Sequence, residues 1–166
     1  MGQGARSAIT LVALGVLLVL ATAWGWNAAT EPLPGKVDTP ICTTQAVAAG
    51  DKVFPQEVTV SVYNAGTRDG LAGRVMKDLQ DDGFAEGDGG NTQAAKVGAV
   101  EIWTTEPDNP AVQLVASHLG DQVDIKRRDG LGAGVTVIVG DDFTKVVKGE
   151  RSVVAKSDAQ ICSPPV

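Results

Sequence analysis

The sequence predicts an α+β fold, a two-layer ferredoxin-like βαββαβ sandwich with an extra strand, preceded by one N-terminal transmembrane helix. Three observations support this prediction. The chain starts with a long apolar run, a β-α unit with marked ends occupies residues 58–84, and a similar pattern returns about forty residues later. The 166 residues leave room for one domain of about a hundred residues after the leader.

The leader is long enough to cross a membrane. Residues 8–23 carry no charge, and the apolar run continues to Trp26, for about 19 residues. Trp24 and Trp26 lie at its outer end, where indole side chains favour the membrane interface. We therefore expect a transmembrane helix at residues 8–26.

The charges beside the leader predict its orientation. Arg6 and the terminal amine precede the span, whereas Glu31 and Asp38 follow it. The positive-inside rule then places residues 1–7 in the cytoplasm and the remaining chain outside the cytoplasmic membrane. A competing interpretation is a cleaved signal peptide, because Ala-Thr-Ala at 21–23 has the form of a cleavage site. Both interpretations export the domain.

Residues 27–57 are predicted to be an extended spacer, since prolines and glycines interrupt any regular element there. The spacer contains Cys42, and the C-terminal tail at 146–166 contains Cys162; the chain has no other cysteine. A disulfide is the default state of such a pair in an exported protein. The alternative is a redox-active or lipidated thiol, but the sequence has neither a Cys-x-x-Cys pair nor a lipobox-like placement to support it.

The central β-α unit has a signal for each of its parts. Thr59, Ser61 and Tyr63 alternate with valines, the period-2 pattern of a half-buried strand. Apolar residues then recur at helical spacing from position 71 to position 79. Thr67 or Asp69 is expected to cap the helix start, and a glycine at 83 suits the left-handed position after the last turn.

The same stretch carries a family resemblance. The segments Asn64-Ala65-Gly66, Gly70-Leu71-Ala72 and Gly83-Phe84 resemble the C-terminal domain of LytR-type cell-envelope proteins, and the likeness extends from about residue 58 to about residue 143. The resemblance implies a role in cell-envelope integrity. It also implies that this chain lacks the phosphotransferase domain that often precedes the module in LytR proteins.

The second half of the domain repeats the pattern. Residues 99–103 alternate as a strand, and Asn109 with the following proline starts a helix that ends near Gly120. Further strands are expected at 123–126 and 135–139. Two β-α-β units with both helices on one face of a single sheet give the predicted sandwich. The predicted order is a cytoplasmic N-terminus, a membrane helix, a spacer, a LytR C-terminal-like domain and a tail, at residues 1–7, 8–26, 27–57, 58–145 and 146–166.

Composition argues against several classes of function. His118 is the only histidine, and no nucleophile motif accompanies it, so we expect no enzyme. One histidine and two distant cysteines form no metal cluster, and no cofactor motif is present. The excess of 20 acidic over 14 basic residues disfavours nucleic acid as a partner.

The glycine-bearing turn is the first candidate binding site. Asn64, Gly66, Arg68 and Gly70 lead into a helix N-terminus, whose free N–H groups can hold an anion such as a phosphate of an envelope polymer. Asp69 would repel that anion. The structural alternative is that these glycines only serve a tight turn.

The second candidate is the sheet face opposite the helices. Tyr63 and Trp103 are expected to lie near each other there on paired strands, in a position to stack on a sugar ring or to anchor a partner protein. The alternative is that the spacer or the tail folds over that face. We therefore expect a non-enzymatic, membrane-anchored protein outside the cytoplasmic membrane. Its partner is either an envelope-assembly membrane protein or a cell-wall glycan, such as peptidoglycan or a phosphorylated polymer.

Overall fold

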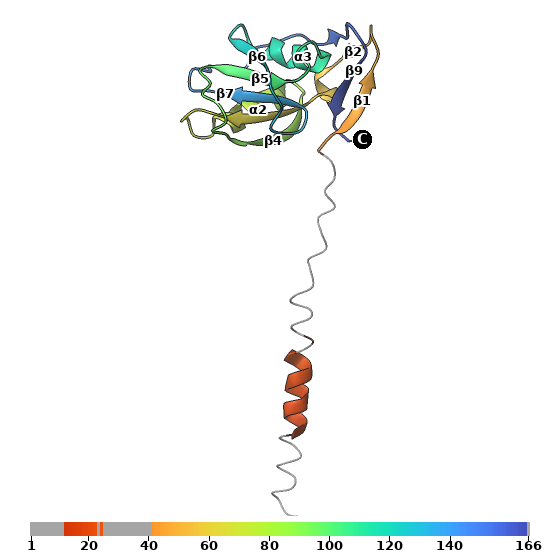
Figure 1. The fold of residues 1–166 in the computed structure, drawn as a ribbon, viewed down its shortest axis with the longest axis vertical. Coiled ribbons are helices and arrows are strands. Elements are labelled where there is room, and N and C mark those ends of the chain that lie inside the picture. The colour runs from red at the N-terminus through yellow and green to blue at the C-terminus, as the bar shows by residue number, and fades with distance from the viewer. Residues whose placement is uncertain (1–11, 23, 25–40, 166) are drawn as a thin grey trace, which may run out of the picture. The chain divides into compact units, whose positions relative to one another are not determined.

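The computed structural model describes residues 12–22, 24 and 41–165. The chain divides into two compact units, Met1–Thr39 and Pro40–Val166, which are described separately (Figure 1). In the first unit, residues 12–22 and Trp24 are helical. The remaining positions of the predicted N-terminus, membrane helix and early spacer lie outside the described residues. Within the described part of the chain, no helix has the length and apolar character that a membrane crossing requires.

A mixed five-stranded sheet in the order β4-β3-β7-β5-β6 forms the centre of the second unit. Its strands are β3 (Thr59–Asn64), β4 (Ala85–Asn91), β5 (Val100–Thr104), β6 (Val123–Arg127) and β7 (Val135–Val139). Strand β3 runs parallel to β4 and to β7, and β5 runs parallel to β6. Strands β5 and β7 are antiparallel. The α+β class and the additional fifth strand are confirmed.

The predicted ferredoxin-like topology is wrong. In that topology each helix connects strands that are not neighbours in the sheet. Here α2 (Leu71–Asp81) connects β3 to the adjacent parallel strand β4, and α3 (Pro110–Leu119) connects β5 to the adjacent parallel strand β6. Strand β7 lies between β3 and β5, and so separates the two β-α-β segments; it is buried along its whole length. Period-2 alternation predicts the faces of a strand but does not predict its neighbours.

Both helices pack on one face of the sheet, as predicted. One hydrophobic core combines apolar residues of α2 and α3 with Val60, Val62 and Ile102, which project from the sheet at alternate positions. Trp103 and Ile138 are buried but lie outside this core, because they project from the other face. This arrangement is the one expected if both crossovers are right-handed, because the strands of the two β-α-β segments run in opposite directions.

The ends of α2 and α3 test the capping residues that the sequence predicted. The N–H of Phe84 bonds to the carbonyl of Leu79, and the N–H of Gly83 (φ 101°) bonds to the carbonyl of Gln80, the Schellman pattern expected there. Asn109 caps α3 by accepting a hydrogen bond from the Ala111 N–H, with proline at the first position. The predicted side-chain cap of α2 is wrong, since its cap residue is a glycine without such a bond.

The flanking segments belong to the folded unit. Strand β1 (Thr43–Val47) pairs with β9 (Ala159–Ser163), and β2 (Lys52–Val53) pairs with β8 (Val153–Val154), both antiparallel. The short 3-10 helix η1 (Pro55–Glu57) then leads into β3. The prediction of an extended spacer at residues 27–57 is therefore wrong from residue 43 onward, where β1, β2 and η1 form. Proline did not prevent these strands, because Pro55 starts the 3-10 helix, where its missing N–H is tolerated.

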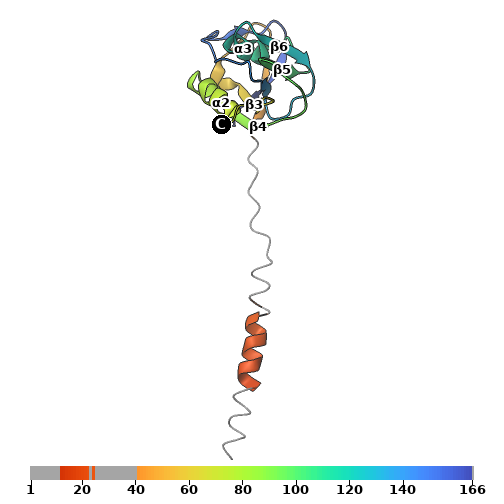
Figure 2. The ribbon, with the colours of Figure 1, turned by 90° about the vertical axis from the view of Figure 1, so that its left-hand side faces the viewer.

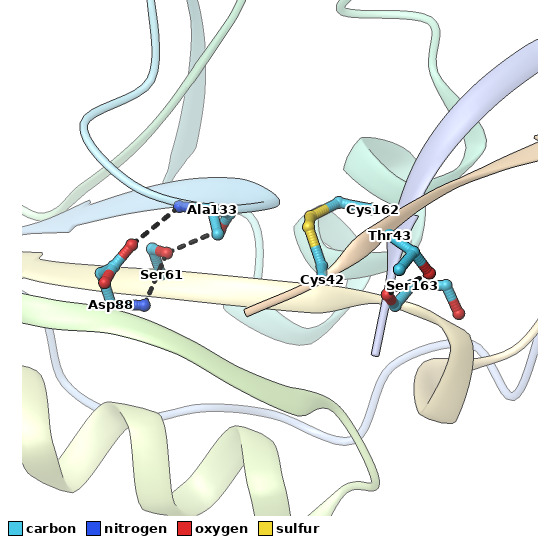
Figure 3. Close-up of a disulfide and its surroundings, with 7 residues drawn as sticks. All are labelled: Cys42, Thr43, Ser61, Asp88, Ala133, Cys162 and Ser163. Carbon is cyan, nitrogen blue, oxygen red and sulfur yellow. Dashed lines mark hydrogen bonds between the residues drawn. A yellow bond between two sulfur atoms is a disulfide. The ribbon is translucent and has the colours of Figure 1, made fainter. Parts of the chain in front are cut away.

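The predicted disulfide between Cys42 and Cys162 is confirmed (Figure 3). The two Cα atoms are 5.4 Å apart, although 120 positions separate the residues in the chain. The bond closes the β1–β9 ladder, in which Thr44 lies opposite Cys162. Figure 1 shows this ladder at the right-hand margin of the unit, and Figure 2 turns that margin away from the viewer. The two ends of the described unit are therefore held together both covalently and by backbone hydrogen bonds.

Candidate functional site

The sheet face opposite the helices is covered by the β6–β7 loop, residues 128–134. The hydroxyl of Ser61 donates to the carbonyl of Ala133 at 2.6 Å and accepts from the N–H of Asp88 at 2.9 Å (Figure 3). The carboxylate of Asp88 in turn accepts from the N–H of Ala133 at 3.0 Å. This three-residue network fastens the loop to β3 and β4. Sequence reasoning expected cover from the spacer or the tail, and the structure assigns it to this loop.

Tyr63 and Trp103 do not occupy paired strands, so that prediction is wrong. Strand β7 lies between them, with Ile138 opposite Tyr63 and Thr136 opposite Trp103. The Tyr63 hydroxyl donates to the carbonyl of Leu131 at 3.1 Å. Burial raises the pKa of that hydroxyl, and the nearby Asp88 carboxylate raises it further by a smaller amount. Tyr63 is therefore a half-buried contact of the covering loop.

Trp103 is almost completely enclosed. Its side chain is 3% exposed, and its indole N–H donates to the carboxylate of Glu101 at 2.8 Å. The guanidinium carbon of Arg128 lies 4.0 Å from the ring centroid, a cation–π contact that covers one face of the ring. The two aromatic residues thus do not form an exposed stacking pair.

The glycine-bearing turn binds a carboxylate of the same chain. Asp141, which follows β7, accepts hydrogen bonds from the backbone N–H groups of Thr67 at 2.8 Å and Arg68 at 3.1 Å. These donors, the Thr67 N–H foremost, lower the pKa of Asp141. The guanidinium of Arg68 donates to the carbonyls of Phe143 at 2.6 Å and Asp141 at 3.2 Å. The Arg68 guanidinium and two backbone N–H groups of the turn, which precede α2, are therefore directed at the chain itself.

The other predicted residues of this turn have structural contacts. The side chain of Asn64 donates to the carbonyl of Arg68 at 2.9 Å and accepts from the N–H of Gly66 at 2.9 Å, which forms an Asx turn. A Cβ on Gly66 would collide with the Asp141 carboxylate. Gly70 adopts φ 68° at the start of α2, a conformation that favours glycine. The structure thus brings Asn64, Gly66 and Arg68 together around Asp141.

His118 is a buried structural residue. Its side chain lies edge-on to Phe84, with ring centroids 5.0 Å apart. Nδ1 is 2.8 Å from the Asp82 carboxylate, and Nε2 is 3.1 Å from the carbonyl of Glu150. Both ring nitrogens are therefore engaged inside the fold. Within the described ranges, no group of three or more His, Cys, Asp or Glu side chains is arranged to hold a metal ion.

Sequence reasoning missed a cavity of about 310 Å³ at the end of the sheet. Strands β3 and β7 begin there, β5 ends there, and the first turn of α3, strand β9 and the covering loop complete the walls. A larger surface concavity of about 800 Å³ adjoins it. Several well-separated segments supply the lining, so no local motif could have revealed it.

Comparisons with known proteins show a family and a distant structural relative. The family model described as LytR cell envelope-related transcriptional attenuator matches residues 57–143, just over half of the chain. This range includes the whole five-stranded sheet and both helices. A search of solved structures found the soluble domain of a conserved hypothetical secreted protein from Mycobacterium marinum, at 21% identity and a TM-score of 0.48. The match covers 62% of this chain and 70% of that one. No curated protein matches the chain.

Proposed function

The chain belongs to the LytR C-terminal domain family, and from this premise we propose that it is a non-enzymatic accessory protein that supports cell-envelope integrity. It acts outside the cytoplasmic membrane as a scaffold for envelope assembly. A leader followed by a single domain of this family resembles the organisation of the mycobacterial-type envelope integrity protein Cei. Transcriptional attenuation is not part of this function, because the acidic chain does not suit nucleic acid.

The disulfide is the observation that carries this proposal. Cys42 and Cys162 join the two ends of the folded unit, and such bonds persist in oxidising compartments. A scaffold that works outside the membrane cannot rely on cytoplasmic chaperones or repair, so a covalent closure of the domain suits that location. The family's relation to the cell envelope is consistent with the same compartment.

The leader provides the anchor in this proposal. Residues 8–26 are apolar, and the described part of that segment is helical. Protease added to intact spheroplasts should remove a C-terminal epitope tag and leave an N-terminal tag protected. Protection of the C-terminal tag would contradict the proposed topology. The mass of the mature protein, measured by mass spectrometry, distinguishes a retained anchor from a cleaved signal peptide.

The engagement of the polar side chains argues against a catalytic role for them. His118, Arg68 and Asp141 each bond to other parts of the fold, an arrangement typical of structural residues. Crosslinking in native membranes followed by affinity purification tests the scaffold function. We expect an envelope-assembly membrane protein to be recovered with the anchored chain, and less of it when a cleavable signal peptide replaces the leader. The proposal would be contradicted if the anchored chain and the version with the cleavable signal peptide recovered only the same background proteins.

A second candidate function is a binding module for peptidoglycan or a phosphorylated cell-wall glycan. The cavity at the end of the sheet favours this candidate, because binding sites for small ligand groups are concave and carry a few fixed polar groups. Co-sedimentation of the protein with purified cell-wall sacculi tests it. A protein that remains in the supernatant at every salt concentration would exclude this function and leave the scaffold function in place.

A further inference from the structure

We propose that the outer edge of β4 pairs with the same edge of a second copy of this chain, so that two domains share one continuous sheet. Strand β4 is an outer strand of the five-stranded sheet, and among the described residues it pairs with β3 alone (Figure 1). Its last three residues, Gly89, Gly90 and Asn91, are exposed. The proposal concerns association of the chain with itself and does not depend on the scaffold or glycan-binding function.

The two edges of the sheet differ in their protection against pairing. The opposite outer strand, β6, contains Asp124, Lys126 and Arg127 among its five residues, and the first two form an ion pair. Charged side chains on an edge strand oppose pairing with another strand. A register shift between Val60 and Val62 marks a bulge that interrupts the first part of β4. The last three residues of β4 follow this bulge and carry neither a charge nor a proline, so this part of the edge is open to pairing.

The backbone groups at this edge are complementary to themselves. The Thr92 N–H bonds to the Asn64 carbonyl of β3. Successive residues of a strand direct their N–H and C=O groups to opposite sides, so those of Asn91 and Gly89 are directed away from β3. In an antiparallel pair about a two-fold axis, Gly89 of each copy lies opposite Asn91 of the other. Each of these pairs then exchanges both backbone hydrogen bonds.

Gly90 lies on the axis in this register. The Gly90 residues of the two copies form a non-hydrogen-bonded pair, with Cα atoms about 4.5 Å apart. A single copy does not require glycine here, because Gly90 has no positive φ and an added Cβ would lie 3.8 Å from the Tyr63 ring, an ordinary contact. Glycine inside a strand often marks the close approach of another backbone. The register also places Asp88 opposite Thr92, so like charges do not face each other.

A second glycine without a role in the single copy lies on α2. Gly73 is exposed, has no positive φ, and has no atom within 4 Å of an added Cβ. Glycine is unfavourable inside a helix, so the isolated domain does not explain this residue. Gly73, Met76 and Gln80 line a groove of about 370 Å³ beside β4, and Gly89 and Gly90 line the same groove. Both unexplained glycines, Gly73 and Gly90, therefore border one groove.

Helix α2 of the second copy fits this groove. Helix α2 contacts both β3 and β4. Adjacent strands lie about 4.8 Å apart, so the continuous sheet brings α2 of the second copy to about 10 Å from the first, on the same face. Two packed helices have interaxial distances of about 8–10 Å. Gly73 lies close to the axis residue Gly90, and its missing side chain lets the two helices approach.

Cysteine crosslinking of the full-length protein in native membranes tests the pairing. Two Gly90→Cys thiols would lie on strands whose Cα atoms are about 4.5 Å apart, within the range for a disulfide. Oxygen with copper phenanthroline as catalyst should join them, and a non-reducing gel detects the doubled mass. Asn91→Cys is the neighbouring control, with Cα atoms roughly 8–9 Å apart. Arg127→Cys on β6 measures random collision. We expect at least about 10-fold more crosslinked dimer for Gly90→Cys than for either control.

Charge variants test the same contact without a covalent bond. Gly90→Glu brings two carboxylates together and should abolish co-purification of differently tagged copies from solubilised membranes. A mixture of Gly90→Glu and Gly90→Lys should restore it. Gln45→Glu adds the same charge to an exposed position of β1 and should leave co-purification unchanged. Thermal unfolding by circular dichroism verifies that each variant is folded.

Three results would overturn the proposal. The first is equal crosslinking of the three cysteine variants, and the second is co-purification that persists in Gly90→Glu or is not restored by Gly90→Lys. The third is a Gly90→Cys crosslink to a different polypeptide, which would assign the β4 edge to another protein. None of these results affects the recovery of an envelope-assembly protein with the anchored chain, so the scaffold function is judged separately.

Discussion

The Asp141 carboxylate accepts two hydrogen bonds from Thr67, one from its backbone N–H at 2.8 Å and one from its hydroxyl at 3.1 Å. The two residues are 74 positions apart, so this contact joins the turn before α2 to the segment after β7. A carboxylate of the chain itself thus occupies two backbone donors of the turn that leads into the predicted anion site. The turn is therefore stabilised by a long-range contact that no local sequence pattern predicts.

The first prediction concerns pH. The donors lower the folded-state pKa of Asp141 below its ordinary value of 3.8, so its contribution to stability is present above that value and is lost as the pH falls through the folded pKa. We expect wild type to lose more stability than Asp141→Asn when the pH falls below 3.8. Urea unfolding across this pH range measures the difference. Asp142→Asn is the matched control, and a pH profile of Asp141→Asn equal to that of wild type would refute the prediction.

The second prediction concerns Arg68. Its guanidinium donates to two carbonyls, those of Phe143 and Asp141, so Arg68→Ala should lower the free energy of unfolding by about 1 kcal/mol, given its exposure. Arg74→Ala changes an exposed arginine of α2 and should have a smaller effect. Denaturant unfolding compares the two. Equal losses for both variants would show that the Arg68 contacts contribute no stability.

The third prediction concerns the disulfide. Replacement of both Cys42 and Cys162 by serine should lower the free energy of unfolding by about 2–5 kcal/mol, because the unfolded chain regains the freedom of a 120-residue loop. Amide hydrogens of β1 and β9 should then exchange faster, since the bond closes their ladder. Hydrogen exchange measured by mass spectrometry checks this. Unchanged protection of both strands would mean that the ladder is stable without the bond.

The fourth prediction concerns the loop that covers Trp103. Gly134 has φ 70°, and a Cβ there would overlap the carbonyl of Thr59, so Gly134→Val should displace the loop and destabilise the fold by at least about 1 kcal/mol. With Trp24 and Trp26 replaced by phenylalanine, Trp103 is the single tryptophan. Its fluorescence should become more accessible to acrylamide in Gly134→Val.

Gly73→Ala is the control for that substitution. Gly73 lies in α2 with nothing within 4 Å of an added Cβ, so alanine should stabilise the helix by about 0.5–1 kcal/mol. Trp103 should stay protected from acrylamide in this variant. Equal quenching of Trp103 in wild type and Gly134→Val would contradict the role assigned to the loop.

The fifth prediction concerns the contact between His118 and Asp82. Nδ1 lies 2.8 Å from the carboxylate, and the ring is buried, so the two side chains should be coupled in stability. A double-mutant cycle with Asp82→Asn and His118→Gln should give a coupling energy of about 1 kcal/mol. Thermal unfolding of the four proteins measures it. Additive single-variant effects would show that the contact is incidental.

Local patterns in the sequence predicted the elements well and their arrangement poorly. The apolar spacing of α2, the Asn109 cap of α3 and the glycine at position 83 are short-range signals, and the structure confirms each one. The order of the strands depends on pairing between distant segments. Strands β2 and β8 are two residues long, and β1 is exposed at four of its five positions, so they carry no periodic signal.

The sequence by itself determined the α+β class, both helices, the strand faces and the pairing of Cys42 with Cys162, because these follow from short-range periodicity or from the presence of only two cysteines. Tertiary structure alone decided that β7 separates Tyr63 from Trp103 and that Asp141 fills the turn before α2. It also created the cavity beside Thr59. The physical reason is that each of these features joins groups that are far apart in the chain, and a contact between them exists only after the sheet has formed.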